Sequence, residues 1–480
     1  MYSKTVPARM DSLTRIQNLE RLRKLRRLAL GCIASLLSLG AGLHISPAWG
    51  TESPLLLSQA TALTEPQATQ AARVSQKQAQ LRQIRAENYD LRQHPVTDAE
   101  EKHWRNILWT TAVVEPQEPF VAQSLSNILA YGRSPGLSVS QRRTINMAFQ
   151  IGTQLYLNHP NVYGALGQQF AETVSASPNP GFVAVALSGL AKSSLPSAQL
   201  QSLSNITRQR FPQWSQNIAL RTTLMDVNEK IAPAPVPPLR DLLNWTVAPG
   251  QLQMFVICGR DRTTLCTAIL KDRQGQFVRE GGQLWSTPLL LRSLHGLGWN
   301  FTRGETPQGI YRIEGTVPQP DSEFFRAFGR FSLVNLYVPF EPGAKSFLPG
   351  RAGAFSGNLK NYEAMLPPSW RSYTPIQQTY WAGYRGRGMF RIHGSGEDPN
   401  FFNKLPQDGA ALPWNPTIGC LSALEIYDGT GRLQQADMPK ILNELTAVGG
   451  KNFSGYLTVV EVPQAVQGAL SVETIEAAMR

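Results

Sequence analysis

Hydrophobic and polar positions follow two different rhythms along the chain, and the first of them is helical. Between residues 98 and 230, apolar residues recur at three- and four-residue spacing, as on one face of an α-helix. The clearest segments are 104–114, 121–131, 145–156 and 182–191, separated by turn signals rich in Pro and Asn. The pattern predicts an all-α module over residues 96–231. It is either a packed bundle or an array of stacked helical pairs whose surface binds a protein partner.

The second rhythm begins after a stiff, Pro-rich linker at residues 232–240. From 241 to 465, short runs of Val, Ile, Leu, Phe and Tyr are broken by Gly and Pro, which is typical of β-strands. A late helix near 437–448 and a last strand, G-Y-L-T-V-V-E-V, complete this part, and a tail follows at 466–480. We therefore predict an α+β protein, with an N-terminal all-α helical module followed by a mainly β domain.

The first 50 residues have the order of an export signal. Basic residues crowd between Arg21 and Arg27, an uncharged apolar run spans Leu28 to Leu43, and small residues precede Gly50. This order predicts a secretory signal cleaved near Gly50 and followed by a tether over 51–95; an uncleaved membrane anchor is the alternative. We expect an exported protein that is peripheral to the membrane after cleavage.

Composition and charge narrow the classes of function. The 480 residues are 42% hydrophobic and 17% charged, as in ordinary globular proteins. Half of the net charge of +12 lies in the first 50 residues, and the rest forms no dense basic block, so nucleic-acid binding is not expected. The later histidines stand at no metal-ligand spacing, and no phosphate-binding loop is present, so we expect no metal and no cofactor.

Three cysteines remain after the signal. Cys258 and Cys266 flank a polar turn between two predicted strands, where they could pair across the hairpin. Cys420 would then be the odd thiol, which in an exported protein is a candidate reactive group. Three buried free cysteines are the alternative.

The segments M-F-R-I-H-G-S and N-P-T-I-G-C-L-S place His393 and Cys420 in glycine-framed settings. The first predicts a strand that delivers the imidazole to a sheet edge, and the second a turn that presents the thiol. A nearby imidazole converts a thiol into the nucleophilic thiolate, and a glycine before the cysteine allows N–H groups to face an oxyanion. These residues predict an acyl-transfer site, with a structural cysteine and histidine as the alternative.

Three motifs, in order, resemble the L,D-transpeptidase (YkuD-like) catalytic domain. They are T-P-Q-G-I-Y-R-I at Thr306–Ile313, I-H-G-S ending at Ser395, and T-I-G-C-L-S ending at Ser422. The family carries T-P-x-G-x-[FY]-x-I, then H-G-[ST], then [ST]-x-G-C. The resemblance spans about residues 245–463 and implies a bacterial protein of the periplasm or cell envelope.

The resemblance also implies a role for each matched residue. Cys420 would be the nucleophile, His393 its base, and Gly394 with Ser395 would orient the imidazole. The backbone N–H groups of Gly419 and Cys420 would form the oxyanion hole. The implied reaction attacks the diamino-acid carbonyl of a peptidoglycan stem tetrapeptide and releases D-Ala. The thioester then passes to an amine of a second stem, which makes a 3→3 cross-link.

The chain departs from the family pattern around the nucleophile. Thr417 matches the family's Ser/Thr, but Ile418 stands where His is common and Ser422 where Arg or Asn is usual. The stretch between His393 and Cys420 is also longer than is common. Other candidate substrate contacts are basic and aromatic residues before H-G-S, each of which could instead be a solvated or packing residue: Arg385, Arg387, Arg391, Trp381 and Tyr384.

The prediction is therefore an exported cysteine L,D-transpeptidase acting on peptidoglycan stem peptides. An L,D-carboxypeptidase or amidase would use the same two residues with water as the acceptor. A catalytically inactive envelope-binding scaffold, in which the helices bind the partner, is the alternative from another class.

Overall fold

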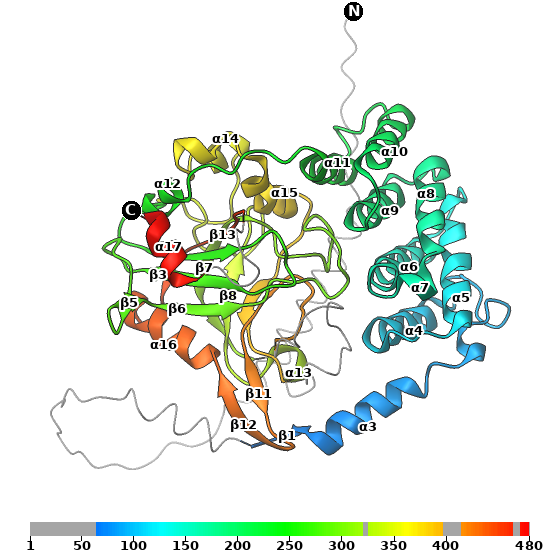
Figure 1. The fold of residues 1–480 in the computed structure, drawn as a ribbon, viewed down its shortest axis with the longest axis horizontal. Coiled ribbons are helices and arrows are strands. Elements are labelled where there is room, and N and C mark those ends of the chain that lie inside the picture. Colours follow the sequence, from blue (N-terminus) through cyan, green and yellow to red (C-terminus); the bar gives the residue numbers. More distant parts are fainter. Residues whose placement is uncertain (1–63, 320–324, 397–413, 464–470, 480) are drawn as a thin grey trace, which may run out of the picture. The chain divides into compact units, whose positions relative to one another are not determined.

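The described part of the chain combines a series of helices with one eight-stranded mixed sheet (Figure 1). This arrangement confirms the predicted mixture of helices and a large sheet. A computed structural model describes residues 64–319, 325–396, 414–463 and 471–479. The predicted export signal at 1–50, and residues 51–63 of the predicted tether, lie outside these ranges.

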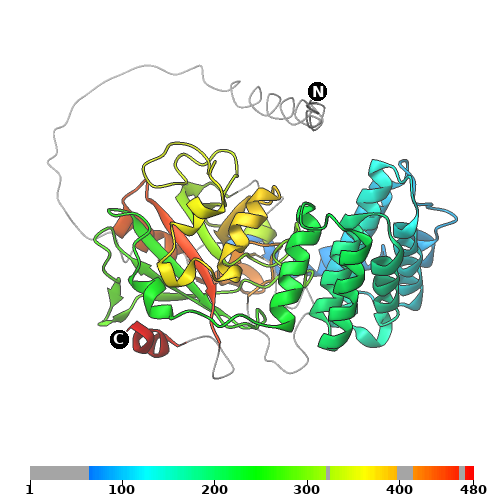
Figure 2. The ribbon, with the colours of Figure 1, turned by 90° about the horizontal axis from the view of Figure 1, so that it is seen from above.

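The helices between residues 101 and 231 follow the predicted three- and four-residue rhythm. They are α4 (Glu101–Val114), α5 (Pro119–Ala130), α6 (Val139–Asn158), α7 (Pro160–Tyr163), α8 (Leu166–Ala176), α9 (Pro180–Lys192), α10 (Ser197–Arg210) and α11 (Ile218–Ile231). Figure 2 shows several of them running side by side. Side chains set some of their starts: Ser138 and Gln141 form a capping box for α6, and Asn179 caps α9. No helix of the described ranges is both long and apolar enough to cross a bilayer.

The helices share one apolar core, and this core also contains residues from outside the predicted module at 96–231. Phe149 lies at its centre, with its ring 5.9 Å from that of Phe170 and 5.5 Å from that of Phe182. Leu297 and Phe301, which precede the T-P-Q-G motif, are buried in the same core. Because burial of apolar area drives packing, these two residues tie the motif segment to the helices.

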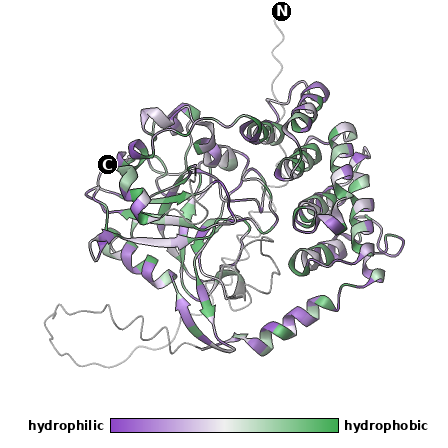
Figure 3. Ribbon diagram, in the orientation of Figure 1, coloured by the Kyte–Doolittle hydropathy of each residue, from purple (hydrophilic) through white to green (hydrophobic). Residues whose placement is uncertain are grey.

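The large sheet follows the order β10-β9-β8-β7-β13-β2-β3-β6. Its strands are β2 (Leu252–Cys258), β3 (Cys266–Lys271), β6 (Ser286–Leu289), β7 (Gly309–Val317), β8 (Leu333–Tyr337), β9 (Phe390–His393), β10 (Leu421–Ser422) and β13 (Ser454–Glu461). The pairs β13–β2 and β10–β9 are parallel, and the others are antiparallel. All seven residues of β2 are buried, and six of them are apolar; the exception, Gln253, hydrogen-bonds to the backbone of Val247 and Trp245. Figure 3 shows the hydrophobic character of the central strands.

The sheet closes on itself through the segment that carries Cys420. Ser422 of β10 exchanges two backbone hydrogen bonds of 2.9 Å with Leu290, the residue after β6. A second bridge pairs Thr417 with Ser293, and the Leu294 N–H donates to the Thr417 carbonyl at 2.7 Å. The T-I-G-C-L-S motif is therefore held by backbone bonds on both sides, to β9 and to the residues after β6.

Two segments differ from the sequence prediction because distant partners order them. Within the predicted tether, β1 (Thr64–Thr69) pairs with β12 (Thr430–Ala436), which also pairs with β11 (Glu425–Tyr427), and α3 (Gln70–Leu81) follows β1. Within the predicted tail, α17 (Val472–Met479) packs on α12 (Leu239–Asn244) and buries Ile475. The sequence predicted a tether with some helix around Arg73 to Arg92, which α3 overlaps, and a C-terminal tail; long-range contacts order β1 and α17 within them.

Smaller elements complete the described ranges, and two of the late predictions are confirmed among them. The predicted late helix is α16 (Met438–Gly449), and the predicted last strand is β13. The remaining short elements are β4 (Arg279–Glu280), β5 (Gln283–Leu284), α13 (Phe325–Phe328), α14 (Leu359–Glu363) and α15 (Gln378–Tyr384).

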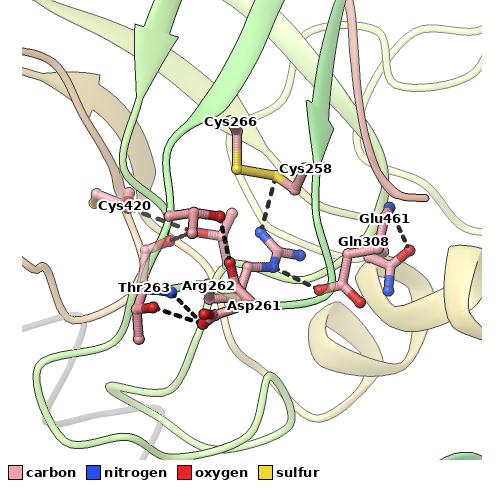
Figure 4. The surroundings of a disulfide bond; sticks show 11 residues. Cys258, Asp261, Arg262, Thr263, Cys266, Gln308, Cys420 and Glu461 are labelled. Carbon is pink, nitrogen blue, oxygen red and sulfur yellow. Dashed lines mark hydrogen bonds and ion pairs between the residues drawn. A yellow bond between two sulfur atoms is a disulfide. The ribbon is translucent and has the colours of Figure 1, made fainter. Parts of the chain in front are cut away.

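Of the two alternatives that the sequence left open for Cys258 and Cys266, the structure has the disulfide. Cys258 ends β2, Cys266 begins the antiparallel β3, and their sulfur atoms are 2.08 Å apart (Figure 4). Cys420 is the free thiol among the described residues. Of the alternatives left open by the sequence, three unpaired cysteines are thus excluded.

Candidate active site

The structure brings the histidine and cysteine motifs together on two neighbouring strands. In the parallel pair β9–β10, Leu421 lies opposite Ile392, and Ser422 lies opposite His393. Leu421 and Ile392 are fully buried in the core beneath the sheet. Because side chains alternate along a strand, Ser422 and His393 share the other face, and Cys420 lies in the bend that leads into β10.

The Cys420 thiol lies beside the backbone at the start of β9. Its Sγ is 3.8 Å from the carbonyl oxygen of Met389, and the Arg391 N–H points at the sulfur. This contact is four residues before His393, and among the described residues the thiol makes no hydrogen bond to the imidazole. Burial raises the pKa of the thiol, while Arg391 and Arg387 act in the opposite direction. The thiol is therefore protonated at neutral pH.

The His393 imidazole is buried and held in one tautomer. Its Nδ1 is 2.6 Å from the Gly394 carbonyl oxygen, so Nδ1 carries the proton and donates it, which leaves Nε2 as the acceptor. The ring of Phe328 meets the imidazole edge-on, with centroids 5.1 Å apart. Burial lowers the pKa of His393 to about 4. The imidazole is thus neutral at neutral pH and able to accept a proton.

The glycine of H-G-S is required by a buried carboxyl group that the sequence did not reveal. A Cβ at Gly394 would lie 2.0 Å from Oε2 of Glu425, and one at Gly329 would lie 2.2 Å from the same atom. Glu425 Oε1 accepts from the Arg330 N–H at 2.7 Å and from the Tyr427 hydroxyl at 2.5 Å. Burial raises the pKa of Glu425 to about 7. The segment that orients His393 therefore rests on a titratable carboxyl group.

Ser395 connects the two motifs. Its Oγ accepts a hydrogen bond of 3.1 Å from the side-chain amide of Asn415, two residues before the T-I-G-C-L-S motif. The predicted site residue Ser395 thus supports the relative placement of the two strands that carry the histidine and the cysteine.

Thr417 and Thr306 shape the turn before Cys420. The Thr417 hydroxyl donates to the Cys420 carbonyl at 2.6 Å and accepts from the Gly419 N–H at 3.2 Å. The Thr306 hydroxyl donates to the Gly419 carbonyl at 3.0 Å. The sequence predicted the Gly419 N–H as an oxyanion donor; here Thr417 occupies it, because the hydroxyl lies two residues away in the same turn.

A buried cation, Arg387, packs directly against the backbone of Gly419. The residue has φ +129°, and a Cβ there would lie 2.3 Å from Nη2 of Arg387. The Arg387 guanidinium donates to three carbonyl oxygens, those of Trp299, Glu305 (2.7 Å) and Gly304 (2.6 Å). Burial lowers its pKa to about 10, so it stays charged at neutral pH. The interpretation of Arg387 as a solvated turn residue was wrong, because its fork is satisfied by backbone carbonyls rather than by water.

The other predicted substrate contacts fall into different settings. Arg391 is half-buried and donates to the Phe390 carbonyl at 2.5 Å. Trp381 is buried, with the Arg221 guanidinium 4.1 Å from its ring centre, so it packs. Tyr384 is 59% exposed. Arg385 is half-buried and donates to the Asn300 carbonyl at 2.5 Å.

Two exposed apolar residues flank the nucleophile. Met389, whose carbonyl contacts the thiol, is 75% exposed, and Ile418, two residues before Cys420, is 46% exposed. Ile418, which departs from the family pattern, therefore presents an apolar surface beside the thiol.

A group of possible metal ligands lies elsewhere, at the start of α4. His94, Glu100 and His103 place one ligand atom each within 4.8 Å of one another. His94 Nδ1 is 2.9 Å from a Glu100 oxygen, and the two imidazole rings stack with centroids 3.6 Å apart. The sequence spacing of the histidines did not predict this group, because the loop before α4 folds back onto the first turn of the helix.

The function must be inferred from this geometry and from the motifs. In comparisons of the chain with protein-family models, with curated proteins and with solved structures, nothing matches.

Proposed function

We propose that the protein is an exported cysteine acyltransferase of the L,D-transpeptidase type, acting on peptidoglycan stem peptides. The observation that carries the proposal is the pairing of β9 with β10. It brings the residue next to Cys420 into register with the residue before His393, whose buried imidazole has a defined tautomer. The order of the three motifs supplies the substrate class.

The proposed reaction begins with two neutral groups. The Cys420 side chain turns from the Met389 carbonyl toward His393, and Nε2 takes the thiol proton as the sulfur attacks the carbonyl of the diamino acid. The tetrahedral intermediate collapses to a thioester, and the departing D-Ala amine takes the proton from His393. An amine of a second stem then attacks the thioester, gives up its proton to Nε2, and releases the thiol.

The surroundings support each step of this sequence. The Gly394 carbonyl holds Nδ1–H and stabilises the imidazolium that forms transiently. Arg387, buried beside Gly419 with only carbonyl partners, supplies positive charge next to the developing anion. The raised pKa of Cys420 and the lowered pKa of His393 keep both groups neutral in the resting site, so the proton moves only when a bound substrate accepts the sulfur's electrons.

Incubation of residues 51–480 with disaccharide-tetrapeptides, followed by mass analysis of the products, tests the proposal. Wild-type protein is expected to give cross-linked dimers and free D-Ala, and Cys420→Ala to give neither. Cys420→Ser is the matched control for packing, because it keeps the volume of the side chain and removes the thiol. A tripeptide product alone would replace transpeptidation by the L,D-carboxypeptidase reaction.

One observation favours a second candidate, an inactive envelope-binding scaffold. The thiol contacts the Met389 carbonyl, and its pKa is raised, as expected for a cysteine that is not activated. Under this alternative the helices α4 to α11 bind the partner. Neither product nor a covalent adduct of a carbapenem on Cys420 would then form, and that outcome would overturn the enzyme proposal.

A further inference from the structure

A charged cleft of about 410 Å³ lies next to the Cys420 turn. Its walls come from α9, α11 and the T-P-Q-G segment, through Lys192, Asp226, Thr306 and Gln308 among others. Cavities of this size accommodate small molecules or short peptide segments. The helices and the catalytic motif therefore build one ligand-sized space together.

Two consecutive residues are shared by the cleft and the Cys420 turn. The Glu305 side chain faces the cleft and pairs with Lys192 at 2.8 Å, while its backbone carbonyl accepts from Arg387 behind Gly419. Thr306 also lines the cleft, and its hydroxyl donates to the Gly419 carbonyl. A ligand in the cleft would thus be separated from the nucleophile's turn by a single layer of backbone.

The cleft lining carries as many acidic as basic side chains, four of each. Some of them satisfy one another: Lys192 pairs with Glu305, and Arg262 pairs with Glu461 at 2.5 Å. Figure 4 shows Arg262 and Glu461 joined beside Gln308, in the same surroundings of the disulfide as Cys420. These pairs fix part of the walls, and Lys230 donates to the carbonyl oxygens of Ala191 and Ser193. Asp226, Glu229 and Arg260 form no ion pair within 4 Å among the described residues, although Lys192 lies near Asp226 and Arg260 near Glu229.

The charges that remain are of both signs. Asp226 accepts one hydrogen bond, from the Trp299 indole at 3.0 Å, and Glu229 accepts one from the Ala234 N–H at 3.0 Å. Arg260 is exposed and makes no ion pair among the described residues. Both residues are half-buried, and this burial raises the pKa of Asp226 and of Glu229.

We propose that this cleft binds the amino-and-carboxylate end of a diamino acid, with the ammonium on Asp226 and Glu229 and the carboxylate on Arg260. A ligand of one sign would meet four like charges, whereas a zwitterion satisfies both sets. The proposal rests on the proposed function, because the diamino acid of a stem peptide carries this group. It assigns to α9 and α11 a part in binding the substrate.

Titration calorimetry on the Cys420→Ala chain, residues 51–480, tests the proposal without turnover. The probes are 2,6-diaminopimelate, pimelate, which lacks both amines, and cadaverine, which lacks both carboxylates. We expect 2,6-diaminopimelate to bind at least about tenfold more tightly than either analogue, since each lost charge pair in a partly buried site is worth about 1.4 kcal/mol or more. Equal binding of the three probes, or binding of none, overturns the proposal.

Variants place the binding in the cleft. Asp226→Asn and Arg260→Gln are each expected to weaken 2,6-diaminopimelate binding about tenfold or more, while Arg92→Gln, which removes an exposed arginine outside the cleft, leaves it unchanged. Arg260 is at the surface, so its variant is informative even if Asp226→Asn unfolds the chain. Binding that survives both substitutions contradicts the assignment.

The cleft and the reaction can fail separately. Cross-linking by wild-type protein is measured in parallel with binding. If the chain binds 2,6-diaminopimelate but forms no product, the proposal for the cleft stands and the enzyme proposal is overturned. If the chain forms product but does not bind this probe, the enzyme proposal stands and the proposal for the cleft is overturned.

Discussion

The Cys420 site and the charged cleft lie on the two sides of residues 304–306, and they differ in the charge of the side chains that form them. In the first, the thiol and the imidazole are both neutral, and the hydrogen bonds of the nearby Arg387 guanidinium within the described residues go to carbonyl oxygens. In the second, carboxylates and cations line one cleft, and two pairs of them are in direct contact. Burial keeps the thiol and the imidazole neutral, which suits groups that gain and lose a proton during a reaction. The oppositely charged side chains of the cleft suit the recognition of a charged ligand.

The two regions also differ in how the chain builds them. The Cys420 site comes from two motifs on adjacent strands, so its reactive residues can be recognised from two short stretches of sequence. The cleft is assembled from α9, α11, the T-P-Q-G segment and the end of β13. The comparison predicts that substitutions at the first site affect rate and leave binding in the cleft unchanged.

The largest expected effect is on the rate, from removal of the base. His393→Ala should slow D-Ala release by roughly 100- to 10,000-fold, because a positioned general base contributes about that much. Binding of 2,6-diaminopimelate, measured by calorimetry, should be unchanged. His159→Gln, at a histidine paired with Glu115 in the helical part, is the control and should keep the full rate. A rate loss in the control as large as in His393→Ala would contradict the assignment of His393 as the general base.

The next effect is on stability, at the glycine of H-G-S. Gly394→Ala places a Cβ 2.0 Å from Glu425 Oε2, so the free energy of unfolding should fall by about 1–3 kcal/mol. Urea unfolding followed by tryptophan fluorescence measures it. In the double variant with Glu425→Ala, the loss should be smaller than the sum of the two single losses, because the clash is gone. Strict additivity would mean that the carboxyl group does not constrain this turn.

Acid titration separates two buried groups of the Cys420 site that act in opposite directions. The folded pKa of His393 is about 4, below its usual 6.5, so its contribution to stability is present above pH 6.5 and is lost as the pH falls toward 4. The folded pKa of Glu425 is about 7, above its usual 4.5, so its contribution is present below pH 4.5 and is lost as the pH rises toward 7.

Between pH 4.5 and 6.5 the two contributions therefore oppose each other. We expect the free energy of unfolding of the wild-type chain to change little over this range. Glu425→Gln should lose stability as the pH falls, and His393→Gln should gain it, each by up to about 1.4 kcal/mol per pH unit. Urea unfolding at several pH values measures the slopes. Parallel slopes for the three proteins would show that neither group titrates as its burial requires.

The contrast between the two regions explains what the sequence could predict. The helical rhythm predicted α4, α5, α6 and α9, and the hairpin predicted the disulfide, because these depend on neighbours in the chain. The motifs predicted that His393 and Cys420 would meet.

The sequence could not predict contacts that join distant segments. Glu425 beneath Gly394, the closure of the sheet by Leu290 and Ser422, and the pairing of β1 with β12 all depend on the folded arrangement. The cleft belongs to this second group as well. An isolated Asp226 in an amphipathic helix resembles any solvated residue until Trp299 and Lys192 pack beside it.

The smallest expected effect is at Thr306, the residue shared by both regions. Thr306→Val keeps the shape of the side chain and removes the hydroxyl that donates to the Gly419 carbonyl, a loss of about 1 kcal/mol. Because that bond shapes the Cys420 turn, acyl transfer should fall about fivefold, while the dissociation constant of 2,6-diaminopimelate should stay within about twofold, since charged groups carry it. Thr306→Ser, which keeps the hydroxyl, should restore the rate. If binding in Thr306→Val weakens as much as the rate falls, the turn and the cleft act as one site, and the division between a neutral reactive region and a charged recognition region does not hold.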